Sequence, residues 1–217
     1  PKEILEETNS DCEIYYVGKR AGCKSFLQSE INSLLLKLSN EGKDIVRLKG
    51  GDPFVFSRGG EEVSFLEEND IFFEIVPGIT SGIAASSYFG IPLTHRNGAS
   101  TVTFVTGHET SEKKEKSVNW RQLAYASDSL VIYMGIRNIE FIVEELLIGG
   151  MPPGTRCAVV QEATLNNQQS LITELAKLPK EIEKNNIKPP AIVIIGKIVD
   201  FKVNNNITKL SSVILRN

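Results

Sequence analysis

Hydrophobic positions along this 217-residue chain follow two alternating patterns. Short apolar or β-branched runs that end at glycine or proline predict strands, and in the first half they occupy residues 13–17, 45–48 and 72–76. Between these runs, apolar positions recur every three or four residues, as on one face of a helix. The clearest helical face is formed by Ile31, Leu34, Leu35 and Leu38. The first half is therefore predicted to alternate strand and helix.

The same alternation restarts after residues 91–98, whose proline, glycine and polar residues are typical of a linker. A helix is predicted over residues 139–147, and residues 170–176 fit either a strand or a helix. The predicted strands are 101–106, 130–133, 157–160 and 191–195. Alternation of this kind predicts an α/β protein with a largely parallel sheet and helices on its faces.

The linker divides the chain into two predicted α/β domains. We expect an N-terminal domain over residues 1–95, a C-terminal domain over residues 96–203 and a tail over residues 204–217. The chain begins at Pro1, without an initiator methionine, in what reads as the middle of a fold. We therefore expect a fragment of a longer protein, with an N-terminal domain that is incomplete at its start.

Composition narrows the class of protein. The chain is 41% hydrophobic and 24% charged, which is ordinary for a globular protein, and its formal charge of −3 argues against a general nucleic-acid or membrane-surface binder. No apolar run approaches the roughly 20 residues that span a bilayer, and no signal-peptide pattern is visible, so a cytoplasmic location is expected. The cysteines at 12, 23 and 157 lack metal-ligand spacing and indicate neither a metal site nor a disulfide.

The candidate chemistry lies in the turns that follow the predicted strands. The run 45–48 meets Gly50, Gly51, Asp52 and Pro53, and the run 72–76 meets Pro77 and Gly78. In open α/β sheets, ligands bind beyond the carboxyl ends of the strands, and paired glycines let a ligand approach the backbone closely. A tight strand-to-helix connection without a ligand is the alternative interpretation of such turns.

Longer stretches around these turns resemble the tetrapyrrole methylase family. The block 46–59 reads Val-Arg-Leu-Lys-Gly-Gly-Asp-Pro-Phe-Val-Phe-Ser-Arg-Gly, and it is long enough to be strong evidence by itself. Tyr133-Met134-Gly135 and Pro190-Ala191 support it. The other matching stretches are 17–22, 76–81 and 91–96. The resemblance covers the chain from about Pro1 to Val199 and is strongest to the members that methylate uroporphyrinogen III.

The resemblance implies two α/β domains with S-adenosyl-L-methionine bound in the cleft between them, and a homodimer. The implied reaction is methyl transfer to ring carbons of uroporphyrinogen III, which gives precorrin-2 and S-adenosyl-L-homocysteine on the way to sirohaem or cobalamin. Family members normally begin with a strand and a loop of the type Gly-x-Gly-Pro-Gly-Asp-Pro, which this sequence lacks. The alternatives are another tetrapyrrole methylase, diphthine synthase, or a non-catalytic cofactor-binding remnant.

The resemblance also implies the residues of the cofactor site. Glycine amides suit the cofactor's carboxylate, and Asp52 suits its ammonium group or ribose hydroxyls; helix capping is the alternative role for Asp52, as it is for Thr80 and Ser81. Met134 and Ala163 would pack on the adenine, with plain core packing as the alternative for Met134. The implied cofactor-binding set is Gly50, Gly51, Asp52, Val55, Thr80, Ser81, Met134, Ala163 and Ala191.

The substrate carries several carboxylates, so its site needs cations. Arg58 and Lys19 are the candidate catalytic residues, because each lies in a loop after a predicted strand and inside a stretch that resembles the family. The planar fork of arginine suits bidentate carboxylate binding. For Lys19, a solvated surface position is the alternative. Neither a metal site nor a dedicated general base is predicted.

Overall fold

The computed structural model describes residues 2–18, 26–108 and 118–203. They divide into two compact units. The first unit contains the described residues of 2–48 and 58–75, and the second contains 49–57 and those of 76–203. Residues 76–95 therefore lie in the second unit. The domain division at residues 95 and 96 stays a prediction.

The first unit is built on helices. The helical face predicted from the sequence is confirmed, because Ile31, Leu35 and Leu38 are buried on α2. At the start of α2 the Glu30 carboxylate accepts a hydrogen bond of 2.7 Å from the backbone N–H of Leu27, which satisfies a donor that the helix leaves unpaired. The helices of the unit are α1 (Lys2–Leu5), α2 (Gln28–Asn40) and α3 (Gly59–Glu68).

A buried carboxylate joins the helices of the first unit. The side chain of Glu62 on α3 is only 5% exposed and accepts hydrogen bonds from Gln28 of α2 at 3.0 Å and from Arg47 at 3.2 and 3.3 Å. A buried charge is tolerated only when it is paired and hydrogen-bonded. This cluster therefore fixes the segment around Arg47 on the two helices.

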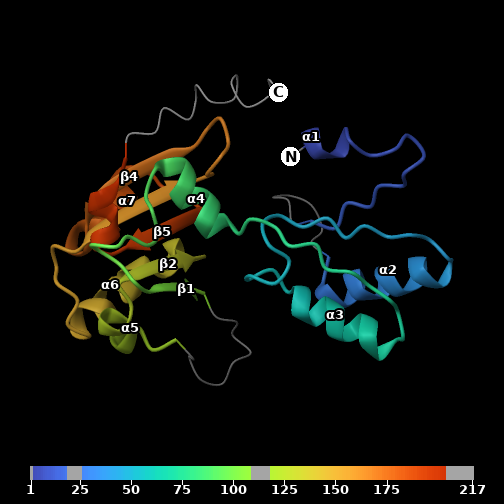
Figure 1. The fold of residues 1–217 in the computed structure, drawn as a ribbon, viewed down its shortest axis with the longest axis horizontal. Helices are drawn as coiled ribbons and strands as arrows, with labels where there is room; N and C mark the ends of the chain where they lie inside the picture. Colours follow the sequence, from blue (N-terminus) through green and yellow to red (C-terminus); the bar gives the residue numbers. More distant parts are fainter. Residues whose placement is uncertain (1, 19–25, 109–117, 204–217) are drawn as a thin grey trace. The chain divides into compact units, whose positions relative to one another are not determined.

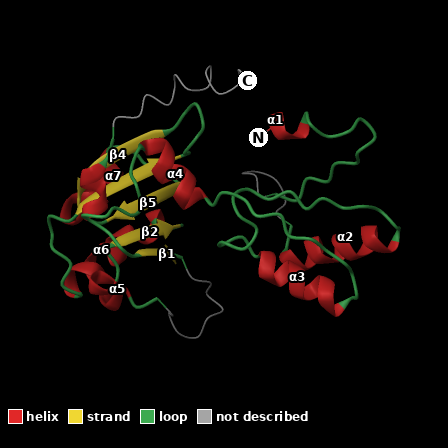
Figure 2. Cartoon of the chain, in the orientation of Figure 1, coloured by secondary structure: helices red, strands yellow, loops and turns green. Residues whose placement is uncertain are grey.

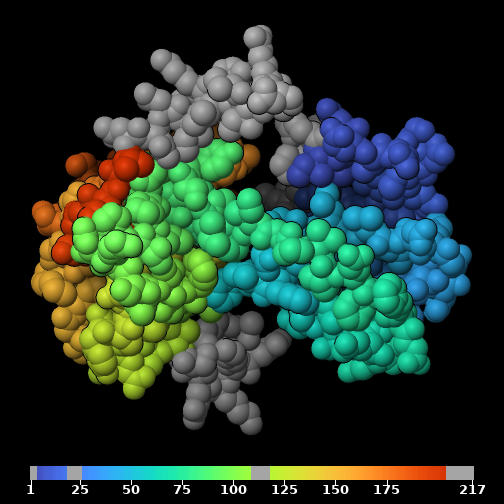
Figure 3. Space-filling view, in the orientation of Figure 1, coloured from blue at the N-terminus to red at the C-terminus, as the bar shows by residue number. Residues whose placement is uncertain are grey.

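The three strands predicted in the first half are wrong. Among the described residues, the runs 13–17, 45–48 and 72–76 are extended but belong to no β-ladder. Val46 is 88% exposed and Phe72 is 95% exposed. Both belong to the first unit, whose N-terminal part is drawn in blue in Figure 3. A strand needs a neighbour for its backbone N–H and C=O groups, and an apolar run alone does not supply one.

The second unit contains one five-stranded sheet (Figures 1 and 2). Each strand predicted in the second half is confirmed. Of the ambiguous run 170–176, residues 170–174 belong to a strand and residues 175–176 begin a 3-10 helix. The strands are β1 (Val102–Thr106), β2 (Ser129–Tyr133), β3 (Arg156–Gln161), β4 (Gln169–Glu174) and β5 (Ala191–Ile195), in the order β1-β2-β5-β3-β4.

The prediction of a largely parallel sheet is wrong for the described strands. Only β1 and β2 pair in parallel, whereas the β2–β5, β5–β3 and β3–β4 pairs are antiparallel. The last strand, β5, inserts between β2 and β3 and runs against both. Alternating strands and helices in a sequence do not reveal such an insertion, because hydrophobic period carries no information on strand direction.

Helices and alternate side chains form a core on each face of this sheet. Leu130 and Ile132 of β2 belong to the core that contains residues of α5, α6 and α7, whereas Val131 and Tyr133 belong to the core beneath α4. The α5 and α7 helices are not predicted from the sequence. The α-helices are α4 (Ser81–Phe89), α5 (Trp120–Ala126), α6 (Ile139–Ile148) and α7 (Leu178–Lys184). Short 3-10 helices are η1 (Ile136–Asn138), η2 (Leu175–Lys177) and η3 (Lys197–Phe201). Within the described ranges, no helix has the length and apolarity to cross a membrane.

Candidate functional site

Two glycine turns of the second unit touch each other through their backbones. A Cβ atom added at Gly78 would lie 2.2 Å from the carbonyl oxygen of Gly51, a distance that real side chains do not adopt. Gly51 itself has a φ of +77°, the left-handed region that favours glycine. The contact between the turns therefore requires glycine at position 78, and the backbone conformation favours glycine at position 51, although the two are 27 positions apart in the chain.

Asp52 fastens this contact. Its carboxylate accepts hydrogen bonds from the backbone N–H groups of Phe54 at 2.8 Å, Val55 at 3.1 Å and Gly78 at 3.2 Å. These bonds, above all the one from Phe54, hold the pKa of Asp52 below its usual value. The alternative role as a cap of the next helix is wrong, because Arg58 occupies the cap position of α3.

The turn at Gly50 and Gly51 is open to an approaching ligand. Both glycines are exposed, and a Cβ atom added at Gly50 would meet no atom within 4 Å. Val55 is half-buried and packs against the core beneath α4. A carboxylate oxygen can accept more than one hydrogen bond, so Asp52 retains acceptor capacity beyond its backbone contacts. The turn therefore presents exposed backbone without side chains beside the carboxylate of Asp52.

Thr80 does not cap α4 with its side chain, although it occupies the N-cap position. Its hydroxyl instead lies 2.7 Å from the hydroxyl of Tyr133, which also accepts a hydrogen bond of 2.8 Å from the N–H of Gly82. Thr80 is buried, whereas Ser81 is exposed. Of these two predicted residues, only Ser81 presents its side chain to solvent.

Met134, Ala163 and Ala191 lie at the same end of the sheet, where Ala191 is buried in the core with α5, α6 and α7 and Ala163 packs against the core beneath α4. The β2 strand ends at Tyr133, immediately before Met134, and the register pairs Gln161 at the end of β3 with Ala191 at the start of β5. Because β5 runs against both neighbours, Met134 and Ala163 flank Ala191 at the same edge. Met134 is 51% exposed, so it is not an ordinary core residue, which was its alternative role.

Strained backbone marks the same edge. Met134, Glu162 and Thr164 have φ values of +54°, +47° and +74°, which non-glycine residues rarely adopt. The loop is braced by a 2.8 Å hydrogen bond from the N–H of Thr164 to the side chain of Gln168. Strain of this kind concentrates at functional sites, where the surrounding structure over-determines it.

Sequence reasoning missed two aromatic residues at the site, Tyr133 and Phe56. The ring of Tyr133 lies 4.8 Å from that of Phe56 and 6.0 Å, edge-on, from that of Phe104. Phe56 has a φ of +51°. One available signal was that a tyrosine at the end of a buried strand must pair its hydroxyl with a polar group.

Of the two predicted catalytic residues, the structure describes only Arg58. Arg58 is exposed, has a φ of +62°, and donates two hydrogen bonds to the carboxylate of Glu61 at 2.6 and 2.9 Å. Its guanidinium already forms the fork that recognises a carboxylate, so a substrate carboxylate would have to displace Glu61. Lys19 lies outside the described residues.

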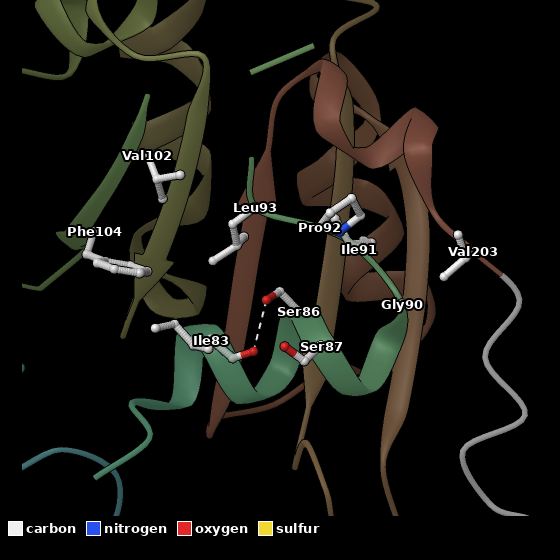
Figure 4. A pocket seen from close by; sticks show the side chains of 10 residues that line it. All are labelled: Ile83, Ser86, Ser87, Gly90, Ile91, Pro92, Leu93, Val102, Phe104 and Val203. Carbon is white, nitrogen blue, oxygen red and sulfur yellow. Dashed lines mark hydrogen bonds between the residues drawn. The ribbon is translucent and has the colours of Figure 1, made fainter. Parts of the chain in front are cut away.

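Two further features of the described residues bear on the site. In the described part of the chain, no three His, Cys, Asp or Glu side chains are grouped so that they could hold a metal ion. A pocket of about 560 Å³ lies between α4, residues 90–93 and β1 (Figure 4). None of the predicted site residues lines this pocket, whose wall is largely apolar.

Comparison with known proteins supports the resemblance of the sequence blocks. The family model described as Tetrapyrrole (Corrin/Porphyrin) Methylases matches residues 2–179. The uroporphyrinogen-III C-methyltransferase of Methanocaldococcus jannaschii is 46% identical over 200 residues, which are 92% of this chain and 82% of that protein. The enzyme of the same name from Bacillus subtilis is 45% identical over 92% of this chain and 77% of that protein.

A solved structure matches as well. The uroporphyrin-III C-methyl transferase of Thermus thermophilus, in complex with S-adenyl homocysteine, superposes with a TM-score of 0.69. The identity is 36%, and the match covers 80% of this chain and 74% of the other. The predicted α/β class and the resemblance are both confirmed. The chain belongs to the tetrapyrrole methylase family.

Proposed function

We propose that this protein is an S-adenosyl-L-methionine-dependent methyltransferase that methylates ring carbons of uroporphyrinogen III to give precorrin-2, a precursor of sirohaem and cobalamin. The observation that carries the proposal is the 46% identity, over 82% of its length, to a uroporphyrinogen-III C-methyltransferase. The Thermus thermophilus relative in complex with S-adenyl homocysteine supports the cofactor. The proposed cofactor site comprises the two glycine turns and the sheet edge at Met134.

The described residues fit this cofactor chemically. At Gly50 the backbone is bare, so an anionic carboxylate can approach the amides of the turn. Asp52 supplies a negative charge for an ammonium group or an acceptor for ribose hydroxyls, and its lowered pKa keeps it charged at neutral pH. Met134, Ala163 and Ala191 supply apolar contact for the adenine. Ser81 adds an exposed hydroxyl beside the glycine turns.

The protein's task in this reaction is alignment. The cofactor supplies a methyl group that its sulfonium already activates. The glycine turns, Asp52 and the sheet edge at Met134 would hold this methyl donor. Transfer would form the bond from a ring carbon to the methyl carbon and break the bond from that methyl carbon to sulfur. The macrocycle would then release a proton from a position next to the methylated carbon, which itself carries no hydrogen. Fixing the reacting groups in line contributes up to about 7–11 kcal/mol to such a step. The turns that Asp52 fastens are suited to hold one reactant rigidly.

Cations must hold the other reactant, because the substrate is a polyanion. Arg58 and Lys19 are the proposed ligands of its carboxylates. In the structure Glu61 occupies the Arg58 guanidinium at 2.6 and 2.9 Å, and exchange of one carboxylate for another preserves the bidentate geometry. The protein is further proposed to act as a cytoplasmic homodimer, without binding nucleic acid or membrane.

The activity is tested by incubating the purified protein with uroporphyrinogen III and S-adenosyl-L-methionine in the absence of oxygen. Formation of precorrin-2, followed by absorbance and mass, together with release of S-adenosyl-L-homocysteine, supports the proposal. Cofactor binding without product, in the presence of the full substrate, contradicts the assigned reaction. Light scattering during size-exclusion chromatography tests the proposed dimer.

The role of Arg58 is tested by Arg58→Ala, with Arg121→Ala as its control. Arg121 also forms a bidentate pair, with both bonds to Glu145 at 2.9 Å, and is similarly exposed on α5, but no part of the site includes it. Arg58→Ala is expected to weaken substrate binding about tenfold or more and to leave S-adenosyl-L-homocysteine affinity within a few-fold. An equal loss of both affinities contradicts a substrate role.

A further inference from the structure

We infer that Tyr133 is a positioning residue for cofactor binding, because it anchors both glycine turns of the proposed site to the sheet. This inference rests on the proposed function. Tyr133 ends β2 and is only 5% exposed. Its hydrogen-bond partners and the rings that it contacts all belong to the second unit. It touches one turn through its hydroxyl and the other through its ring.

The hydroxyl of Tyr133 holds the turn that begins α4. It accepts a hydrogen bond from the N–H of Gly82, one of the first-turn donors that a helix cannot pair internally. It also bonds the hydroxyl of Thr80, the residue that would otherwise cap this helix with its own side chain. Tyr133 therefore provides from a neighbouring strand the cap that Thr80 does not.

The close approach of α4 to Tyr133 depends on a glycine. A Cβ atom added at Gly82 would lie 2.4 Å from the Tyr133 hydroxyl oxygen and 2.7 Å from a side-chain carbon of Val131. Because the position admits no side chain, the N–H of Gly82 can reach the phenol at 2.8 Å. The sequence Thr-Ser-Gly at residues 80–82 therefore suits a helix start that is anchored from outside.

The ring of Tyr133 holds the other turn. Phe56 packs on it at 4.8 Å between ring centroids, in the segment 49–57 that carries Gly51 and Asp52. The two turns are then joined to each other by the Gly51–Gly78 contact and by the Asp52 carboxylate. Tyr133 thus closes a ring of contacts around the proposed cofactor-binding backbone.

Tyr133 also precedes a residue with an unusual backbone conformation. Met134, proposed to pack on the adenine, has a φ of +54° and is half exposed. The side chain of Tyr133 is fixed by two hydrogen bonds and by two aromatic contacts, including Phe104 at 6.0 Å. Fixing Tyr133 fixes the direction in which the chain leaves β2, and with it the position of Met134.

The test is Tyr133→Phe, which keeps the ring and removes the hydroxyl. We expect the dissociation constant for S-adenosyl-L-homocysteine to rise about tenfold, the worth of one to two hydrogen bonds. We also expect KM for S-adenosyl-L-methionine to rise while kcat at saturating cofactor changes less than about threefold, since the residue acts on binding geometry. Titration calorimetry and steady-state kinetics measure the two effects.

Thr101→Val is the matched control. The Thr101 hydroxyl also makes two hydrogen bonds, both with Asp128 and at 2.9 and 3.0 Å, but it lies outside the site. If Tyr133 acted only through stability, both variants would alter cofactor affinity equally when compared at the same interval below their melting temperatures. Parental affinity in a folded Tyr133→Phe protein would overturn the inference.

A second variant keeps the inference testable if Tyr133→Phe does not fold. Thr80→Val removes the partner hydroxyl but leaves the bond from the N–H of Gly82 to Tyr133, so we expect it to weaken S-adenosyl-L-homocysteine binding by a smaller factor; unchanged affinity would overturn the inference. If both variants fold, the double variant should bind as Tyr133→Phe does, because that variant already lacks the bond to Thr80. Failure of the parent protein to bind S-adenosyl-L-homocysteine would instead refute the proposed function.

Discussion

In the second unit the side chains of Val131 and Ile194 are fully buried, whereas in the first unit Val46 and Phe72 are 88% and 95% exposed. These residues come from runs of similar apolar character. The β2 and β5 strands each pair with a strand along both of their edges, and helices pack on both faces of the sheet. Among the described residues, the runs of the first unit remain extended and pair with no strand.

The difference shows that an apolar run specifies burial, while a β-ladder requires a second backbone. The first unit is held instead by the α2–α3 pair and by the buried Glu62 cluster, which depend on helical spacing and charge. In the second unit the apolar runs are buried and also have a neighbouring backbone to pair with. This unit also contains the proposed cofactor-binding residues. Substitutions placed in matched pairs measure this contrast.

The largest contrast is expected between Ile194→Ala and Ile14→Ala. Ile194 is fully buried in β5, so its truncation should lower the free energy of unfolding by about 2–5 kcal/mol, through lost burial and a cavity. Ile14, in an extended run of the first unit, is 57% exposed, and its truncation should cost less than about 0.5 kcal/mol. Urea denaturation measures both, and equal losses would mean that the first-unit run is packed in solution.

A second pair contrasts the starts of α3 and α4. Gly82 and Gly60 are each the second residue of their helix. Alanine at Gly82 would meet Tyr133 and Val131 at under 3 Å and should cost about 1–3 kcal/mol. Alanine at Gly60 would meet no atom within 4 Å and should stabilise by about 0.4–1 kcal/mol. Thermal unfolding checks the opposite signs; a loss at Gly60 would show that α3 is covered on that side.

The sequence predicted most elements of the second unit because the spacing of apolar residues in each element matches the way in which that element is buried. The strand 130–133 and the helix 139–147 are examples, and both are confirmed as β2 and α6. It did not predict that β5 would lie between β2 and β3, since strand order depends on contacts between distant residues. It also could not show that the runs 13–17 and 45–48 lack ladders, because pairing is not a local property.

For the site, local chemistry was more informative than arrangement. The glycine turns at Gly51 and Gly78 were both identified as candidates from their place after apolar runs. Their mutual contact, the bond from Gly78 to Asp52, and the anchoring by Tyr133 join residues that are 26 to 77 positions apart. Spacing along the chain does not encode such contacts, so the roles of Asp52 and Tyr133 required the structure.

A third contrast lies within the first unit, between Glu62→Gln and Glu61→Gln. Glu62 is buried and paired with Arg47 and Gln28, so loss of its charge should cost about 1–2 kcal/mol. Arg47 is 29% exposed, which keeps the cost below that of a fully buried pair. Glu61 pairs with Arg58 at the surface, where removal should cost less than about 1 kcal/mol. Equal costs, measured by urea denaturation, would show that the buried cluster does not stabilise the unit.

The smallest effects concern two carboxylates, the half-buried Asp52 and the exposed Glu13, whose pKa values are lowered by different partners. In the second unit, backbone N–H groups, first that of Phe54, lower the pKa of Asp52. In the first unit, the hydrogen bond from Lys43 at 2.7 Å is the main cause of the lowered pKa of Glu13. For both, the folded pKa lies below the unfolded one, so the stability they contribute is present above about pH 4 and is lost as pH falls through the folded pKa.

Salt should separate the two carboxylates. The Glu13–Lys43 pair is an exposed ion pair, and its attraction weakens in 1 M salt, where the screening length falls to roughly 3 Å. The hydrogen bonds of Asp52 to fixed backbone groups are less sensitive to salt. The melting temperatures of Asp52→Asn and Glu13→Gln, compared with the parent between pH 7 and 2.5, measure this. At low salt both differences should shrink as the carboxylates of the parent become protonated. In 1 M salt the Glu13→Gln difference should shrink at pH 7 while that of Asp52→Asn persists; a difference for Asp52→Asn that does not change with pH would show that its charge does not stabilise the contact between the turns.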